Sequence, residues 1–396
     1  MASEFRPSGR SMVPPFEVMA ILDRVATLRA TGRDVVSLCA GEPSGGAPTD
    51  VRELAVQVHA SSDPLGYTGP LGMLELRSAI ADHYRRWYDL DVDPGSVGVT
   101  TGASGAFVLV FLAAFDVDDR VAVVRPGYPA YRNVLHALGI EVVDLDVGPE
   151  TGFQPTVANL EAAGPLDGLV LASPANPTGS MLSRAELAEL VEWCAAKGVR
   201  VISDEIYHGI TYPTDPSAPD ARGTCAWSLD RSTVVVSSFS KYWGMTGWRI
   251  GWALLPDDLR DRVDALAGNV ALCPPTPSQV PALGAFTERS YREADAHVAA
   301  MAETRQYLFD ALPRLGWGPV APADGAFYLW AGIADQLGNH PDATSWCSAL
   351  LEEAGVALVP GIDMDPVNGG SYVRLSFAAG QAAVAEAVER IIAFQA

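Results

Sequence analysis

Lys241 is the residue of this 396-residue chain whose surroundings best suit covalent chemistry. It lies in the stretch Ser-Ser-Phe-Ser-Lys-Tyr-Trp-Gly at 237–244, directly after a short apolar run. A lysine amine that is partly withdrawn from water has a lowered pKa and can form a Schiff base with a carbonyl compound. A solvated loop lysine is the alternative for Lys241 taken alone, and its polar neighbours favour the chemical interpretation.

Hydroxyl and guanidinium groups close to this lysine are suited to holding a phosphate. Ser238, Ser240 and Arg249 together offer charge-assisted hydrogen bonds to a doubly charged anion. These three residues therefore predict an anion site beside the reactive amine.

A second candidate for phosphate binding is the turn Thr-Gly-Ala-Ser-Gly at 101–105. We expect it to end a strand and to precede an apolar helix over about 106–115, so that the backbone near Ala103 and Ser104 can hold an anion. Glycine turns of this kind are common, and this one gains weight only beside the other candidates.

Three further polar residues follow apolar runs and suit an aromatic nitrogen heterocycle. An ionised Asp204 can keep a pyridine nitrogen protonated, which makes the ring a better electron acceptor. The Tyr207 phenol and the Asn176 amide can bind a phenolic oxygen on such a ring. Each has a structural alternative: Asp204 can cap a helix, and Asn176 can belong to a tight turn at 176–179.

Arg374 lies in the alternating stretch Tyr-Val-Arg-Leu-Ser-Phe at 372–377. An arginine in an otherwise apolar strand predicts bidentate capture of a carboxylate, although an exposed strand arginine is the simpler reading. Gly41, in the stretch Cys-Ala-Gly-Glu-Pro at 39–43, lets the backbone approach the same carboxylate or serves only a turn.

Short runs rich in β-branched residues alternate with amphipathic stretches along the chain. The runs expected to form strands are 121–124, 168–172, 199–203, 233–237 and 250–254. Apolar strands separated by helices, such as the one expected over 183–197, predict a parallel sheet covered on both faces. Because the candidate residues follow these runs, they should meet at the carboxyl ends of the strands, where such sheets bind ligands.

The length of the chain predicts two closely joined domains. Further helices are expected over 54–61, 73–87 and 382–394. We expect a large domain over 48–290, and we assign the segment 1–47 and the residues 291–396 to a smaller domain.

Charge and cysteine content narrow the class of protein. The net charge of -21 argues against binding to nucleic acid or anionic lipid. The five cysteines are scattered and form no C-x-x-C pair, so neither a disulfide framework nor a metal site is expected. Residues 1–15 lack the continuous apolar stretch that is typical of a signal peptide, and no later segment has about 20 uninterrupted apolar residues. We therefore expect a cytoplasmic protein with small-molecule substrates and no membrane partner.

Together these motifs resemble those of the class I and II aminotransferases, which have pyridoxal 5′-phosphate (PLP) fold type I and belong to the aspartate aminotransferase superfamily. The resemblance is to its prokaryotic branch and covers about residues 35–378. The most specific match is Ser-Phe-Ser-Lys at 238–241 with Met-Thr-Gly-Trp-Arg at 245–249. The other matching motifs are Ala-Gly-Glu-Pro at 40–43, Gly-Tyr-Thr at 66–68, Glu-Leu-Arg at 75–77, Gly-Ala-Ser at 102–104, Pro-Gly-Tyr-Pro at 126–129, Asn-Pro-Thr-Gly at 176–179, Asp-Glu-Ile-Tyr at 204–207 and Arg-Leu-Ser-Phe at 374–377.

The resemblance implies both a fold and an activity. The fold is α/β, with a large domain whose mainly parallel seven-stranded sheet is sandwiched by helices, and a smaller α/β domain. The activity is transfer of the amino group of an L-amino acid to a 2-oxo acid by a ping-pong mechanism, with PLP as the cofactor. Lys241 would form the Schiff base with PLP and move the proton between the substrate and the cofactor.

The resemblance also implies the remaining roles in the site. Asp204 would pair with the ring nitrogen, Asn176 and Tyr207 with the ring oxygen, and Tyr128 with the ring face; Ala103, Ser104, Ser238, Ser240 and Arg249 would surround the phosphate; Gly41, Asn176 and Arg374 would bind the substrate carboxylate. In this family a tyrosine at the position of Tyr67 reaches the phosphate of the neighbouring subunit. A homodimer with two shared sites is therefore implied.

The sequence departs from the family pattern in places that bear on the substrate. Ser104 stands where dicarboxylate-specific members of the prokaryotic branch often have a lysine. Asp363 and Asp365 discourage an acidic substrate if they face the pocket, and otherwise they are solvated. The apolar segment 13–19 either closes over the site or packs in the core. We expect neutral aliphatic or aromatic amino acids to be preferred, with aspartate second.

Other functions are compatible with parts of this pattern. A PLP-dependent lyase that catalyses β-elimination uses the same fold and lysine, and product analysis separates it from a transaminase. A PLP-sensing regulator is disfavoured, because it would be expected to carry a basic DNA-binding module, whereas this chain is strongly acidic and only about forty residues precede the family-like region. A nicotinamide dehydrogenase is disfavoured because no G-x-G-x-x-G turn follows an early strand.

Overall fold

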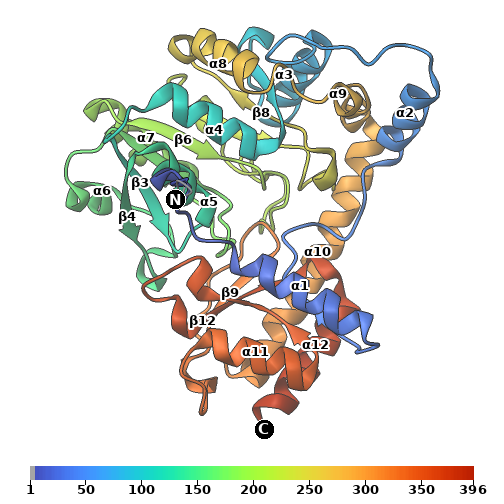
Figure 1. Ribbon diagram of the computed structural model, residues 1–396, viewed down its shortest axis with the longest axis vertical. Coiled ribbons are helices and arrows are strands. Elements are labelled where there is room, and N and C mark those ends of the chain that lie inside the picture. The colour runs from blue at the N-terminus through green and yellow to red at the C-terminus, as the bar shows by residue number, and fades with distance from the viewer. Residues whose placement is uncertain (1–4) are drawn as a thin grey trace.

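Two lobes make up the protein, seen in a computed structural model that describes residues 5–396 (Figure 1). The large lobe is built on a seven-stranded sheet, and the small lobe on two short sheets. The strands are β1 (Val36–Ser37), β2 (Val97–Thr100), β3 (Arg120–Arg125), β4 (Glu141–Asp146), β5 (Gly168–Ala172), β6 (Arg200–Asp204), β7 (Val234–Ser238), β8 (Gly251–Leu254), β9 (Tyr328–Gly332), β10 (Val356–Ala357), β11 (Val359–Pro360) and β12 (Tyr372–Ser376).

The large sheet has the strand order β2-β8-β7-β6-β5-β3-β4. Strands β3 to β7 pair in parallel, whereas β8 is antiparallel to both of its neighbours. The expected α/β fold with a mainly parallel sheet is confirmed, and each of the five expected runs forms a strand. The expectation of a parallel arrangement was wrong for β8. The segment 239–250 contains no crossover helix, which a parallel connection usually requires.

Both faces of this sheet are buried, as the continuous apolar strands predict. On β5, Leu169 and Leu171 belong to one hydrophobic cluster, while Val170 between them belongs to another on the opposite face. Successive side chains of a strand point to opposite faces, so each face needs its own cover of helices. The rigid, doubly covered sheet positions the loops at its carboxyl edge.

Twelve α-helices complete the described part of the chain. They are α1 (Glu17–Ala30), α2 (Thr49–Ala60), α3 (Leu74–Tyr88), α4 (Gly102–Ala114), α5 (Pro129–Leu138), α6 (Val157–Ala163), α7 (Arg184–Lys197), α8 (Asp257–Val270), α9 (Thr276–Ala282), α10 (Glu288–Leu315), α11 (Ala343–Ala354) and α12 (Gln381–Gln395). Local signals fix some ends: a capping box of Ser183 and Glu186 begins α7, and left-handed Gly198 ends it.

Two helices begin earlier than the sequence suggested. Helix α2 begins at Thr49 rather than at 54, and α4 begins at Gly102 rather than near 106. Ala103 and Ser104, expected in a turn, therefore belong to the first turn of α4. Their N–H groups are among those that a helix N-terminus leaves without an internal acceptor.

The small lobe joins both ends of the chain. Strand β1 pairs in parallel with β10, and β12 lies between β11 and β9 in the other small sheet. Helix α10 runs from one lobe toward the other, and α1 lies along the small lobe (Figure 1). The division of the chain at residues 47 and 290 stays a prediction.

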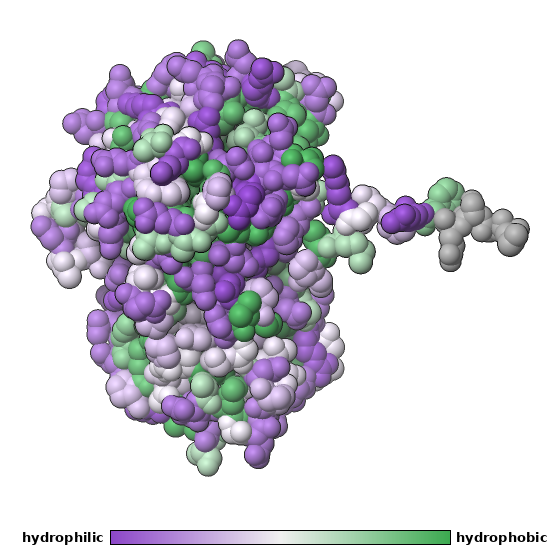
Figure 2. Space-filling view, turned by 90° about the vertical axis from the view of Figure 1, so that its left-hand side faces the viewer, coloured by the Kyte–Doolittle hydropathy of each residue, from purple (hydrophilic) through white to green (hydrophobic). Residues whose placement is uncertain are grey.

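The first described residues project away from the body of the molecule (Figure 2). Phe5 and Met12 on this stretch are largely exposed. Within residues 5–396, the helices are all too short or too polar to span a bilayer.

Candidate active site

A cavity of about 520 Å³ lies between the two lobes, at the carboxyl edge of the large sheet. Its walls come from loops after β3, β5, β6 and β7, from the start of α4, and from the small lobe. The predicted site residues that line it are Gly41, Ala103, Ser104, Tyr128, Asn176, Asp204, Tyr207, Ser238, Ser240, Lys241, Arg249 and Arg374. Tyr67 alone among the predicted residues does not.

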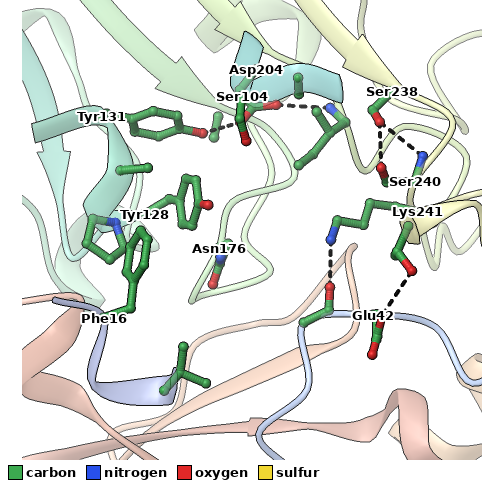
Figure 3. A pocket seen from close by; sticks show the side chains of 18 of the residues that line it. Phe16, Glu42, Ser104, Tyr128, Tyr131, Asn176, Asp204, Ser238, Ser240 and Lys241 are labelled. Atoms are coloured by element: carbon green, nitrogen blue, oxygen red, sulfur yellow. Dashed lines mark hydrogen bonds between the residues drawn. The ribbon is translucent and has the colours of Figure 1, made fainter. Parts of the chain in front are cut away.

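Lys241 follows the end of β7 and reaches into the cavity (Figure 3). Its Nζ donates a hydrogen bond of 2.6 Å to the carbonyl oxygen of Gly41. Removal from water lowers the pKa of Lys241 to about 8, against the nearby negative charge of Glu42, which raises it. The amine is therefore available in its neutral, nucleophilic form close to neutral pH.

The corner beside Lys241 gathers hydrogen-bond donors. Oγ of Ser238 lies 2.8 Å from Oγ of Ser240 and accepts the Ser240 N–H at 3.0 Å. Arg249 adopts a left-handed backbone conformation and turns its guanidinium toward the first turn of α4. A Cβ on Gly102 would lie 2.6 Å from Nη2 of Arg249, and the φ of +68° at Gly102 is one that favours glycine.

Asp204, the last residue of β6, is buried on the sheet side of the cavity. The hydroxyl of Tyr131 donates a hydrogen bond to Oδ2, and the N–H of Ile206 donates to Oδ1 at 3.1 Å (Figure 3). Burial raises the pKa of Asp204 to about 6, while the hydrogen bonds from Tyr131 and Ile206 lower it. No helix begins in the described segment directly after Asp204, because the next helical turn starts at Ala226. The helix-capping alternative was therefore wrong, and the bond to Ile206 stabilises the loop after β6.

Tyr207 and Asn176 also line the cavity, and each contacts a residue of the small lobe. The hydroxyl of Tyr207 lies 2.9 Å from the hydroxyl of Tyr328, a residue of β9. Burial raises the pKa of Tyr207 well above its usual range, so the phenol stays protonated and can donate. Oδ1 of Asn176 accepts a hydrogen bond of 3.0 Å from Nη1 of Arg374.

Arg374 is buried in the middle of β12 and is therefore no exposed strand arginine. Nη2 donates to the carbonyl of Cys39 at 3.0 Å, and the guanidinium lies 4.6 Å from the ring centre of Tyr328. Its buried Nε has no hydrogen-bond partner among residues 5–396. A buried guanidinium with donor capacity to spare is suited to an incoming carboxylate.

Sequence reasoning missed the two tyrosines that support this site. Tyr131 lies 73 residues before Asp204, and Tyr328 lies 121 residues after Tyr207. The only local signal is that Tyr131 falls one helical turn after Tyr128 on α5, and the two rings meet edge to face at 5.4 Å.

The N-terminal segment reaches the cavity, as one of its two interpretations required. Phe16 stacks on Tyr128 with ring centres 6.1 Å apart, and Val18, Met19 and Leu22 of α1 also line the wall. Val18 and Leu22 also pack against a hydrophobic cluster of the small lobe. The segment therefore contributes both to the cavity and to the core.

The two loop carboxylates differ in position, and neither is solvated as expected. Asp365 is buried and accepts a hydrogen bond of 2.8 Å from Nη1 of Arg125, so it does not face the cavity. Asp363 lines the cavity, and its Oδ2 is buried. The expectation of solvation was wrong because the loop folds tightly between the lobes.

Tyr67 lies outside this cavity and is 83% exposed. The large apolar side chains of Val56, Leu65 and Leu74 in the same part of the sequence are exposed as well. This region of the single chain thus presents apolar surface to the solvent.

Comparisons with known proteins agree with this geometry. The family model "Aminotransferase class I and II" matches residues 33–391. The valine–pyruvate aminotransferase of Mycobacterium tuberculosis is 49% identical over 384 residues, which cover 96% of each chain. The aspartate/prephenate aminotransferase of Thermus thermophilus is 33% identical and covers 95% of each chain.

The fold also matches solved structures along its whole length. A crystal structure of an aminotransferase from Mycobacterium tuberculosis superimposes with a TM-score of 0.94 at 48% identity, covering 99% of each chain. The chain belongs to the class I and II aminotransferases, PLP-dependent enzymes that transfer the amino group of an amino acid to a 2-oxo acid.

Proposed function

We propose that this aminotransferase takes a neutral amino acid with an apolar side chain, such as valine, as its donor and pyruvate as its acceptor. The observation that carries this proposal is the set of charges in the cavity. Among the residues that line it, the cations are Lys241, Arg249 and Arg374. Since each already has a role with the cofactor or with the substrate's α-carboxylate, none remains for a second carboxylate on the side chain.

The residues of the cavity fit PLP. The corner formed by Ser238, Ser240 and Arg249 against the first turn of α4 would hold the phosphate, and the absence of a Cβ at Gly102 leaves room for the guanidinium. Asp204 would face the ring nitrogen, and Tyr207 and Asn176 the ring oxygen. When bound, PLP supplies an aldehyde for covalent attachment and a ring that accepts electrons from the substrate.

Lys241 and Asp204 divide the proton chemistry between them. Nζ of Lys241, whose pKa is lowered to about 8, would hold the cofactor and would then carry the proton removed from Cα of the substrate to the cofactor. Asp204 would keep a proton on the ring nitrogen through its carboxylate, which Tyr131 and the backbone of Ile206 hold in place. Asp204 ends β6 and Lys241 follows the end of β7, so the rigid sheet preorganises their mutual position.

Arg374 orients the substrate. Its buried guanidinium would bind the α-carboxylate in a bidentate manner, with Gly41 close by and Asn176 fixing one nitrogen at 3.0 Å. A Cβ on Gly41 would lie 3.0 Å from the hydroxyl of Tyr328, so glycine keeps this side of the cavity open. Such anchoring aligns the Cα–H bond with Lys241.

Apolar residues make up the wall that the substrate side chain would meet. Phe16, Val18, Met19 and Leu22 line it from the N-terminal side and Met364 from the small lobe. Burial of an aliphatic side chain there contributes about 25 cal/mol per Å² of apolar surface removed from water. The name of the Mycobacterium tuberculosis relative, a valine–pyruvate aminotransferase, supports the same substrate class.

We further propose that the enzyme is a cytoplasmic homodimer. The exposed Tyr67 and its apolar neighbours would be covered by a second subunit, whose phosphate corner the tyrosine hydroxyl would reach. All five cysteines are free thiols, which suits a reducing compartment.

A panel of amino acids assayed with pyruvate tests the proposed substrate class. We expect valine and other neutral aliphatic donors to give alanine and the corresponding 2-oxo acid, with kcat/KM at least tenfold above that for aspartate. Aspartate as the best donor would overturn the proposal. Release of pyruvate and ammonia from a β-substituted amino acid without any acceptor would instead indicate a lyase.

A further inference from the structure

The loop from Gly361 to Ser371 is held firmly against the large lobe. Nη1 of Arg125, at the end of β3, donates to Oδ1 of Asp365 at 2.8 Å, and both side chains are buried. The N–H of Gly127 donates to the carbonyl of Met364 at 3.1 Å. Removing one partner of a buried pair leaves an uncompensated charge, so this pair strongly fixes the loop.

Within the loop, the backbone is closely packed. Asp365 also accepts the N–H groups of Val367 and Asn368, each at 2.9 Å. A Cβ on Gly361 would lie 2.5 Å from the carbonyl oxygen of Gly369, so the two arms of the loop touch. The position of Asp363 is therefore set by the fold rather than by solvent.

Asp363 presents a carboxylate to the cavity from this rigid loop. Its Oδ2 is buried and has no hydrogen-bond partner among residues 5–396. The backbone N–H groups of Glu17 and Val18, at the start of α1, are the hydrogen-bond donors beside it. Phe16, the cap residue of α1, provides no side-chain hydrogen bond of its own, so the carboxylate of Asp363 lies near N–H groups that this helix end leaves without an internal acceptor.

We infer that Asp363 is a specificity-determining residue that excludes amino and oxo acids with an acidic side chain from the cavity. This inference rests on the proposed function and names the residue that enforces its preference for neutral substrates. A carboxylate on the substrate side chain would lie beside the buried Oδ2 of Asp363. The two negative charges would repel each other unless one of the two groups took up a proton. Specificity of this kind comes from electrostatic repulsion of the wrong substrate rather than from added attraction to the right one.

Burial raises the pKa of Asp363, while the positive charge of Arg374 and the N–H groups of α1 lower it. The same carboxylate thus lies within the electrostatic reach of the arginine proposed to bind the substrate. An acidic side chain bound through Arg374 would have to share this space with Asp363.

The substitution Asp363→Asn separates selectivity from helix capping. Asparagine keeps one oxygen that can accept a hydrogen bond beside the start of α1, and it removes the charge. The matched control is Glu17→Gln, which removes one negative charge from the same corner at an exposed side chain outside the cavity.

The experiment measures kcat/KM for aspartate and for valine, and the inhibition constant of maleate, in the holoenzyme and both variants. We expect Asp363→Asn to raise the aspartate-to-valine ratio of kcat/KM at least tenfold and to lower the inhibition constant of maleate by a similar factor. Glu17→Gln should change both quantities less than twofold.

An unchanged ratio and an unchanged inhibition constant in a folded Asp363→Asn variant would overturn the inference, and so would an equal change in Glu17→Gln. These outcomes are distinct from failure of the proposed function. That failure would show in the unmodified enzyme, as aspartate being the best donor.

Discussion

Nη1 of Arg374 donates a hydrogen bond of 3.0 Å to Oδ1 of Asn176, across 198 residues of sequence. The arginine belongs to β12 of the small lobe, and the asparagine follows β5 of the large one. This contact joins the group proposed to bind the substrate carboxylate to the group proposed to bind the cofactor ring. A direct hydrogen bond between the two lobes is therefore formed by two proposed site residues.

Conservative replacement of Arg374 tests the carboxylate anchor. Arg374→Lys should lower kcat/KM for valine about 10²-fold, because a lysine ammonium cannot make the bidentate contact and charged hydrogen bonds each contribute about 1.5–3 kcal/mol. The measurement is steady-state kinetics with valine, beside single-turnover rates with 2-methylpropylamine, which lacks the carboxylate. An equal loss with the amine would show that Arg374 acts on something other than the carboxylate.

Labelling of lysine tests which amine carries the cofactor. The chain has only two lysines, Lys197 and Lys241, and Lys197 is exposed at the end of α7. Borohydride reduction of the PLP-bound protein should fix one pyridoxyl group on Lys241 and none on Lys197, because the amine of Lys241 lies in the cavity with its pKa lowered to about 8. Peptide mass spectrometry reads the result, and equal labelling of Lys197 would contradict it.

The hydrogen bond from Tyr131 sets the pH range of Asp204. Burial raises the pKa of Asp204 to about 6 and the Tyr131 hydroxyl lowers it, so Tyr131→Phe should raise it further. Activity that needs the ionised carboxylate falls as the pH drops through this pKa. The acid limb of kcat/KM should therefore move to higher pH in the variant, with a smaller change above pH of about 8.

A matched control for this substitution is Tyr212→Phe. The Tyr212 hydroxyl donates to the carbonyl of Ala326, and the residue does not line the cavity. Its acid limb should stay in place. A limb that stays in place in Tyr131→Phe as well would show that Asp204 does not control the pH dependence.

Tyr67 tests the shared site of the proposed dimer. Light scattering should give twice the mass of the single chain of 41.9 kDa. Tyr67→Phe should leave the dimer intact and weaken PLP binding about tenfold, since it removes one hydrogen bond to a charged group. Tyr307→Phe, in α10 outside the cavity, is the control for an absorbance titration with PLP. A monomer that binds PLP with full affinity would contradict the proposal.

Local patterns were sufficient to predict the polar residues at the strand ends. Lys241, Asp204 and Asn176 each follow an apolar run, and parallel strands bring such positions to one edge of the sheet. The strand bounds followed from the same runs, within one residue for β5 to β8. The alternation of strands and helices was thus sufficient to predict most of the architecture of the large lobe.

Contacts between distant segments could not be predicted in this way. The bonds from Tyr131 to Asp204 and from Tyr207 to Tyr328 depend on how α5 and β9 pack against the loop after β6. The burial of Asp365 depends on its pairing with Arg125, 240 residues away in sequence. No periodicity or turn signal encodes such pairs, because they arise only when the lobes come together.

The measurement that tests the central claim most directly is a set of single-turnover spectra of the PLP-bound enzyme, with one amino acid added at a time and no 2-oxo acid present. The account predicts that valine and other neutral aliphatic amino acids convert the absorbance of the lysine-bound cofactor to that of pyridoxamine phosphate, that aspartate does so at least tenfold more slowly, and that Lys241→Ala abolishes the starting band. A band that no amino acid converts, or one that aspartate converts far faster than every neutral amino acid, would contradict it.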